Sequence, residues 1–190
     1  MSDITAVPLR PVGKSGVTAL WAGVALLLAA GIGGGVYAST AARRAAVASP
    51  AMAKLSAPDF LAANGKRRGV RTTASGVEYL VIKPGSGPTP TAADIALIDY
   101  RGTLTDGTVF DLTKPGEPAQ LPVGQVVPGF AEAMMLMRKG SQYRVWLPPQ
   151  LAYGDRQAGT IPPGSVLVFD ITMHDFAPMP SGMPGQQPGM

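Results

Sequence analysis

The chain has 190 residues, which suits one ordinary domain with accessory segments. It contains no cysteine and a single histidine, His174, so disulfides, thiolate metal sites, cysteine nucleophiles and multi-histidine metal sites are excluded. The 24 glycines and 19 prolines are many for a compact domain and indicate that part of the chain lacks regular structure.

Positive charge is concentrated outside the part of the chain that is predicted to fold. Residues 39–76 carry seven basic residues and one acidic residue, whereas residues 77–177 carry seven basic and ten acidic residues. A nucleic-acid-binding domain would carry its positive charge on the fold itself, so we expect no nucleic-acid partner. Attraction of the basic segment to anionic lipid is an alternative role for it.

An uncharged apolar run, residues 17–38, follows the polar N-terminal segment 1–16. At a rise of about 1.5 Å per residue, this run is long enough to cross a hydrocarbon layer of about 30 Å. We expect an uncleaved transmembrane anchor, and the alternative is a signal sequence cleaved near Ala38, where small residues have the spacing of a cleavage site. Basic residues flank both ends of the run, so charge does not predict its orientation.

Two further segments flank the predicted domain. Residues 39–69 are basic and rich in alanine, and we interpret them as a linker that contains a short helix between residues 52 and 64. Residues 178–190 consist of Pro, Gly, Met, Gln and Ser without charge, which predicts a disordered tail.

Residues 70–177 predict an α+β domain. Alternating apolar residues predict strands near residues 77–82, 95–100, 143–147 and 166–175, and Asp106-Gly107 predicts a hairpin with a two-residue turn. One helix is predicted from Gly129 to Lys139, with Gly140 as its stop. These elements bury a common core only if an antiparallel sheet wraps around that helix.

The domain lacks the residue patterns of covalent or acid–base catalysis. The serines have no histidine near them in the sequence, and His174 falls on the polar face of the last predicted strand. No glycine-rich phosphate loop follows a strand, and the carboxylates form no evident acid–base pair. We therefore expect no metal and no cofactor.

Six short motifs instead occur in order along the domain. They are Asp99–Gly102 (DYRG), Asp106–Asp111 (DGTVFD), Val123–Phe130 (VGQVVPGF), Leu147–Gly154 (LPPQLAYG), Ile161–Gly164 (IPPG) and Leu167–Asp170 (LVFD). In order and spacing, these motifs resemble the FKBP-type peptidyl-prolyl cis-trans isomerases over about residues 72–176. The lead-in, residues 69–76, resembles the bacterial macrophage infectivity potentiator-like branch. Members of that branch often dimerise through a long helical N-terminal region, for which the short linker leaves little room.

The resemblance implies a pocket lined mainly by aromatic residues. The residues expected to act in catalysis are Tyr100, Phe110, Asp111, Phe130 and Tyr153. Those expected to bind substrate are Val126, Val127, Ile161 and Phe169. Phe130 would form the floor, Phe110 and Phe169 the walls, and Asp111 would accept a hydrogen bond from Tyr100. The Tyr153 hydroxyl and the Ile161 N–H would donate to substrate carbonyls.

The sequence departs from the family pattern at two places. Much of the family has tryptophan at the pocket floor, where this chain has Phe130, and an aromatic residue expected near residues 119–121 is absent. A macrolide ligand would therefore bind with reduced affinity.

The predicted hairpin determines which residues of its second strand can face the pocket. In the ideal register of a two-residue turn, Gly102 faces Asp111, and Tyr100 and Asp111 share one face. Phe110 would then point to the opposite face. Both Phe110 and Asp111 can line one pocket only if the strand bulges or ends at that point.

The resemblance implies isomerisation of X-Pro bonds in folding polypeptides, without covalent or proton-transfer steps. The alternative is a membrane-tethered module or chaperone that binds proline-containing segments without turnover. The bacterial branch implies a single-pass protein of the inner membrane with a periplasmic domain, or a protein released into the periplasm after cleavage.

Overall fold

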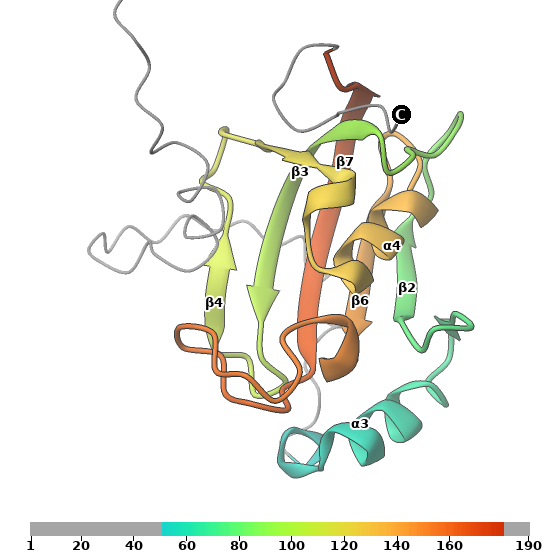
Figure 1. The fold of residues 1–190 in the computed structure, drawn as a ribbon. Coiled ribbons are helices and arrows are strands. Elements are labelled where there is room, and N and C mark those ends of the chain that lie inside the picture. The colour runs from blue at the N-terminus through green and yellow to red at the C-terminus, as the bar shows by residue number, and fades with distance from the viewer. Residues whose placement is uncertain (1–50, 181–190) are drawn as a thin grey trace, which may run out of the picture. The chain divides into compact units, whose positions relative to one another are not determined.

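The computed structural model describes residues 51–180 (Figure 1). Its helical elements are η1 (Met52–Lys54), α3 (Ala57–Asn64), η2 (Val123–Gln125), α4 (Pro128–Leu136) and η3 (Pro149–Leu151). Its strands are β1 (Val70–Thr72), β2 (Glu78–Lys83), β3 (Asp94–Thr103), β4 (Val109–Leu112), β5 (Ala119–Pro122), β6 (Gln142–Leu147) and β7 (Leu167–Pro178).

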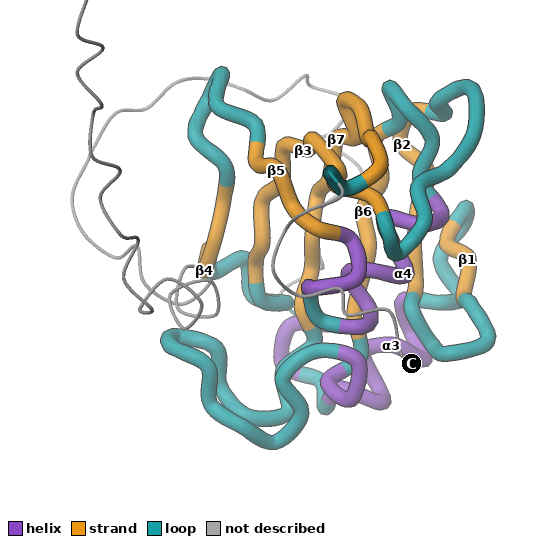
Figure 2. Tube along the Cα trace, turned by 45° about the horizontal axis from the view of Figure 1, so that its top comes forward, coloured by secondary structure: helices purple, strands orange, loops and turns teal. Residues whose placement is uncertain are grey.

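All seven described strands belong to one antiparallel sheet. The strand order is β1-β2-β6-β7-β3-β4, and β5 pairs with the other half of the long strand β3. Figures 1 and 2 show α4 lying against one face of this sheet. The antiparallel sheet around one short helix that the sequence predicts is therefore confirmed.

The main core lies between the sheet and α4. Alternate residues of β7 point to this side, as expected from the two-residue period of a strand, and they are buried: Leu167, Phe169, Ile171 and Met173. The predicted apolar stripe of the helix is buried against them: Phe130, Ala133, Met134 and Met137.

The helix is shorter than the sequence predicts. It ends at Leu136, and Met137 is already extended, with ψ at 136°. Arg138 and Lys139 therefore lie outside the helix and do not interact with its dipole as basic residues of a last turn would. Gly140 has the expected positive φ, 77°, but it serves the turn that leads into β6.

A second, smaller core lies on the opposite face of the sheet. Phe60 of α3 packs there with Trp146, Val166 and Val168. Ser56 caps α3, because its side chain accepts a hydrogen bond from the Asp59 N–H. The short helix expected in the linker 39–69 is thus present, but it is part of the fold and not a spacer.

Several expectations concern residues outside the described range. The N-terminal segment 1–16, the apolar run 17–38, residues 39–50 of the linker and residues 181–190 of the tail all lie outside it. Between residues 51 and 180, no helix has the length and apolar character that a membrane span requires.

Candidate active site

Four aromatic rings meet on the inner face of the sheet beside α4. Phe130 of α4 and Phe169 of β7 have ring centroids 4.7 Å apart, and Phe110 packs edge-on against Phe169 at 5.5 Å. Tyr100 of β3 lies 5.9 Å from Phe130 and 6.2 Å from Phe169. These contacts bring the expected floor, Phe130, together with both expected walls.

The β3–β4 hairpin brings Phe110 to this cluster through two local changes: the turn is one residue longer than expected, and β4 contains one extra residue. The Leu104 N–H donates to the Thr108 carbonyl at 2.8 Å, and Gly107 has a φ of 91°, so the turn contains three residues and not the two expected. Thr103 then pairs with Val109, whereas Gly102 pairs with Asp111. Phe110 is the extra residue between these pairs, and the predicted bulge is thereby confirmed.

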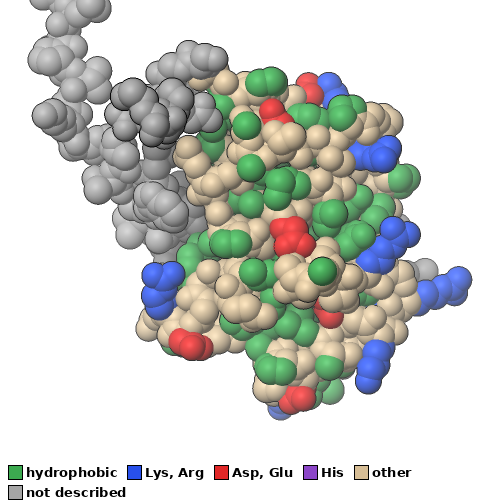
Figure 3. Space-filling model, turned by 45° about the vertical axis from the view of Figure 1, so that its right-hand side comes forward, with side chains coloured by type: hydrophobic (Ala, Val, Ile, Leu, Met, Phe, Trp, Pro, Cys, Tyr) green, Lys and Arg blue, Asp and Glu red, His purple; other side chains and the backbone are tan. Residues whose placement is uncertain are grey.

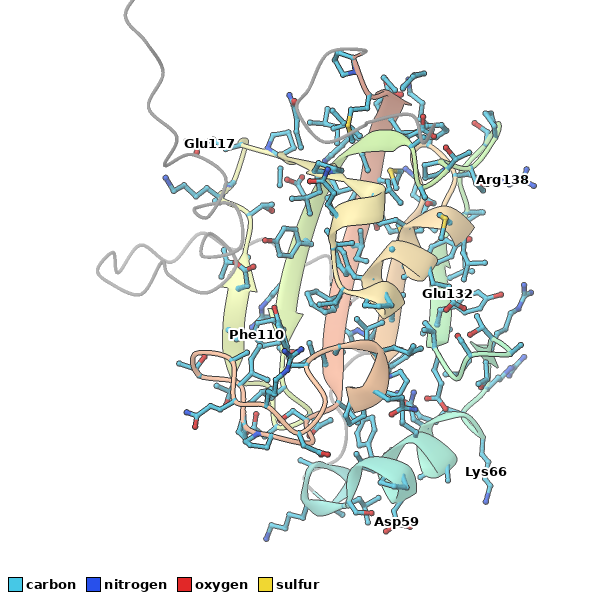
Figure 4. The ribbon with its side chains drawn as sticks, viewed as in Figure 1. Asp59, Lys66, Phe110, Glu117, Glu132 and Arg138 are labelled. Atoms are coloured by element: carbon cyan, nitrogen blue, oxygen red, sulfur yellow. The ribbon has the colours of Figure 1, made fainter. Side chains whose placement is uncertain are left out.

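Gly102 leaves the space that the two walls occupy. A Cβ atom at this position would lie 2.6 Å from Cε2 of Phe110 and 2.9 Å from Cε1 of Phe169. Figure 4 shows Phe110 at the start of β4, next to the loop that connects β6 to β7. The bulge and the glycine together therefore turn the Phe110 ring inward.

Tyr100 and Asp111 form the polar edge of the cluster. The Tyr100 hydroxyl donates a hydrogen bond of 2.7 Å to Oδ2 of Asp111, as the predicted register requires. Burial raises the pKa of Tyr100 well above its usual range, and the hydrogen bond to Asp111 and the negative charge of this carboxylate act in the same direction. Tyr100 is therefore a neutral hydrogen-bond donor at every physiological pH.

Tyr153 approaches this edge from the β6–β7 loop. Burial raises the pKa of the Tyr153 hydroxyl, and the nearby charge of Asp111 raises it further. The hydroxyl has no hydrogen-bond partner among residues 51–180. Tyr153 is thus a half-buried, neutral donor that is available to a ligand.

Ile161 differs from the expectation. Its side chain is buried in the main core, but its N–H already donates to the Ala158 carbonyl at 2.9 Å. The N–H of Val127, at the start of α4, has no hydrogen-bond partner within the described chain. Val127 and Val126 are half-buried against the aromatic cluster, so Val127 is the better-placed backbone donor.

The cluster has no constellation for metal or proton-transfer chemistry. Within the described range, no group of three His, Asp or Glu side chains could hold a metal ion. His174 is exposed, and its Nε2 lies 2.7 Å from Oδ2 of Asp99 on the outer face of β3 and β7. What the geometry offers is an apolar site with three neutral donors at its edge.

Sequence and structure comparisons relate the part of the chain that carries this site to one protein family. The sequence model for the FKBP-type peptidyl-prolyl cis-trans isomerases matches residues 87–174, a range that contains every expected site residue. The crystal structure of a peptidyl-prolyl cis-trans isomerase from Pseudomonas syringae is 31% identical, with a TM-score of 0.61, and the match covers 64% of this chain and 90% of that one. This chain belongs to the FKBP-type family of peptidyl-prolyl cis-trans isomerases.

Curated FKBP-type relatives are more similar in sequence but longer. The isomerase FkpA of Aeromonas hydrophila is 50% identical over 60% of this chain and 43% of its own length. The outer membrane protein MIP of Legionella longbeachae is 46% identical over 59% of this chain and 49% of its own. The chain thus spans about half the length of the curated relatives that it matches.

Two features of this FKBP-type site escaped sequence reasoning. Gly102 stands in a recognised motif, but the clash that makes glycine necessary depends on the bulge and on the position of β7. The unpartnered N–H of Val127 could have been found, because Pro128 predicts the first turn of a helix, where N–H groups have no partner within the helix.

Proposed function

We propose that the chain is a peptidyl-prolyl cis-trans isomerase that acts on X-Pro bonds of folding polypeptides. The barrier to rotation about a peptide bond is about 18–20 kcal/mol, because rotation breaks amide resonance. Isomerisation of X-Pro bonds takes tens to hundreds of seconds without a catalyst, which is slow enough to limit folding. No bond has to be broken, so an enzyme needs only to bind the twisted amide more tightly than the planar one.

The aromatic cluster supports this mechanism. The planar amide is the more dipolar form, so water stabilises it more than the twisted form. A proline ring packed among Phe110, Phe130 and Phe169 would place its amide where little water remains. The site would thereby lower the relative free energy of the twisted amide.

Two of the three donors at the edge of the site would hold the substrate chain. We assign the Tyr153 hydroxyl and the Val127 N–H to carbonyl groups of the substrate, because both donors are unpartnered among the described residues. Tyr100 would orient Asp111 and keep the polar edge of the site rigid. Ile161 would contribute its buried side chain and not its N–H.

The observation that carries this proposal is the convergence of Phe110, Phe130 and Phe169 beside the Tyr100–Asp111 hydrogen bond. A protease-coupled assay of an X-Pro peptide with the full chain tests it. We expect catalysed isomerisation that Phe110→Ala largely removes. Wild-type protein without activity, although folded by circular dichroism, would exclude the proposal.

Binding of proline segments without turnover is the second candidate. Phe130 favours it, because phenylalanine offers a smaller floor than tryptophan. NMR exchange spectroscopy on a short X-Pro peptide separates the two candidates. Exchange cross-peaks between cis and trans forms indicate an enzyme, whereas shift changes without exchange indicate a binding module.

We also propose that residues 17–38 anchor the chain in the inner membrane, with the domain in the periplasm. The length and lack of charge of this run support an anchor, and the name of the Legionella longbeachae relative supports a location in the cell envelope. The mass of the native protein tests the alternative, which is cleavage near Ala38. Titration with a macrolide should show weaker binding than to a family member with tryptophan at the pocket floor.

A further inference from the structure

A cluster of two arginines and two tyrosines lies away from the aromatic site, at the edge formed by β1, β2 and β6. The rings of Tyr79 and Tyr143 are stacked, with centroids 5.8 Å apart and planes 7° from parallel. Arg71 is the direct cross-strand neighbour of Tyr79 in the β1–β2 register, so both side chains share one face. We name Arg71, Tyr79, Arg138 and Tyr143 the arginine–tyrosine patch.

Both arginines of the patch act on Tyr143. Burial raises the pKa of Tyr143 and the neighbouring Tyr79 raises it further, whereas the positive charges of Arg138 and Arg71 oppose this rise. Arg71 and Arg138 are exposed, and the two tyrosine rings are only half-buried. The patch therefore presents flat aromatic surface between two exposed cations.

Further positive charge continues along this edge. Lys66 and Arg68, in the segment that leads into β1, are also exposed. Figure 3 shows Lys and Arg side chains gathered along the right-hand side of the view. Figure 4 shows Lys66 and Arg138 on the same edge of the molecule, with Glu132 between them. Glu132 is the nearby carboxylate, and it accepts a hydrogen bond of 2.6 Å from Ser75.

We propose that the arginine–tyrosine patch is a docking surface for an anionic lipid bilayer. Tyrosine prefers the boundary between headgroups and acyl chains, and arginine near an anionic membrane gains about 1 kcal/mol from its surface potential. An acidic protein would match the charge as well, but the chain itself argues for lipid, because only 13 residues separate the uncharged run 17–38 from Met52.

The short connection keeps the domain near the membrane that we propose this run to enter. A fully extended chain from Ala38 to Met52 reaches at most about 50 Å, so a surface with weak lipid affinity would meet the bilayer at high effective concentration. The high effective concentration depends on the anchor proposed above. The charge of the patch does not depend on it. Docking by this edge would hold the domain at one orientation to the membrane.

Site-specific fluorescent labelling tests the inference, because the chain has no native cysteine. An environment-sensitive dye is attached to full-length Ala74→Cys, in the turn that follows β1, or to Glu117→Cys, which Figure 4 shows on the opposite side. Each protein is mixed with vesicles of phosphatidylcholine, with or without phosphatidylglycerol. We expect a blue shift at residue 74 only, only with phosphatidylglycerol, and reversed by high salt.

The variant Arg71→Gln/Arg138→Gln should weaken this response about fivefold per arginine, or near thirtyfold in all. The matched control, Arg101→Gln/Arg156→Gln, removes two exposed arginines elsewhere and should leave it unchanged. Equal shifts of both labels would overturn the inference. So would a response that survives in Arg71→Gln/Arg138→Gln, or that Arg43→Gln/Arg44→Gln removes instead.

The failure of the anchor and that of the patch are distinguishable. A chain that does not remain with neutral vesicles on flotation contradicts the anchor, while the label at residue 74 still reports on contact with added anionic vesicles. A label that responds to polyglutamate but to no vesicle identifies an acidic protein as the partner and overturns the lipid assignment.

Discussion

The Phe110 ring occupies the space directly above Gly102, where a Cβ atom would lie 2.6 Å from Cε2 of that ring. The two residues are not register partners, because Gly102 pairs with Asp111 and Phe110 is the bulged residue beside this pair. Phe169 of β7 borders the same space, because the Cβ atom at residue 102 would lie 2.9 Å from Cε1 of its ring. The position of both pocket walls thus depends on the absence of a side chain at residue 102.

We predict that Gly102→Ala displaces Phe110 and lowers isomerase activity about tenfold or more. The added methyl group must move two rings, and overpacking of this kind costs about 1–3 kcal/mol of stability. Kinetics on an X-Pro peptide and urea unfolding measure the two effects.

Gly116→Ala is the matched control for this change. Gly116 has a φ of 79° and no atom within 4 Å of an added Cβ, so alanine strains the backbone without touching the pocket. Its activity should equal that of the wild type. Wild-type activity in Gly102→Ala as well would contradict the role assigned to the glycine.

A second prediction compares the contribution of the apolar wall, Phe110, with that of the hydrogen-bond donor at the edge of the site, Tyr153. Phe110→Ala removes apolar contact worth about 1.5–3 kcal/mol, so kcat/KM should fall about ten- to hundredfold. Tyr153→Phe removes one hydrogen bond worth about 0.5–1.5 kcal/mol, and its effect should stay below about tenfold. Leu112→Ala, on the same strand but 51% exposed, is the control and should retain full activity. A larger loss in Tyr153→Phe than in Phe110→Ala would reverse the assignment.

The hairpin shows what local sequence can and cannot predict. Asp106-Gly107 correctly predicts a turn, and the expectation that Phe110 and Asp111 line one pocket correctly predicts a bulge. The turn itself is one residue longer than expected, and the bulge at Phe110 restores the register. The two deviations cancel, so the ideal register predicts the pairing of Gly102 with Asp111 correctly although it assumes a turn that is one residue too short.

Other errors come from contacts that the local pattern does not contain. The apolar spacing from Phe130 to Met137 is helical, but Met137 reaches the same core from an extended backbone. The alanine and basic residues around Phe60 predict a linker, whereas its partner Trp146 lies far along the chain. The bond from the Ile161 N–H to Ala158 likewise depends on how the loop folds back on itself.

The third prediction concerns pH. Burial is the main cause that raises the pKa of Tyr100 above its ordinary value of 10.0, and the hydrogen bond to Asp111 is the second. The hydroxyl proton therefore stays bound from pH 6 to about pH 9. A raised pKa contributes stability that is present below about pH 10 and is lost as the pH rises through the higher value. We expect kcat/KM to be flat from pH 6 to about pH 9. A decline there that Tyr100→Phe abolishes would show that the hydroxyl ionises.

The fourth prediction concerns Glu78, which is buried between the sheet and the end of α3. Burial raises its pKa above 4.5, although the hydrogen bond of 2.6 Å from Asn64 acts in the opposite direction. The raised pKa contributes stability below about pH 4.5, and this contribution is lost as the pH rises through the folded-state value. Glu78→Gln keeps an acceptor for Asn64 without the charge, so its stability relative to wild type should increase from pH 4.5 to pH 7. Urea unfolding at both values measures this, and a constant difference would contradict it.

The last prediction tests whether α3 belongs to the folded domain. Phe60 is 1% exposed against Trp146 and Val168, so Phe60→Ala should lower the free energy of unfolding by about 3–5 kcal/mol. Leu55→Ala, five residues before Phe60 and 41% exposed, should change it by less than about 0.5 kcal/mol. Urea unfolding followed by tryptophan fluorescence is the appropriate measurement, because Trp146 is the direct partner of Phe60. If both variants unfold with the wild type, α3 contributes nothing to stability, and the domain begins near Val70 as the sequence alone suggests.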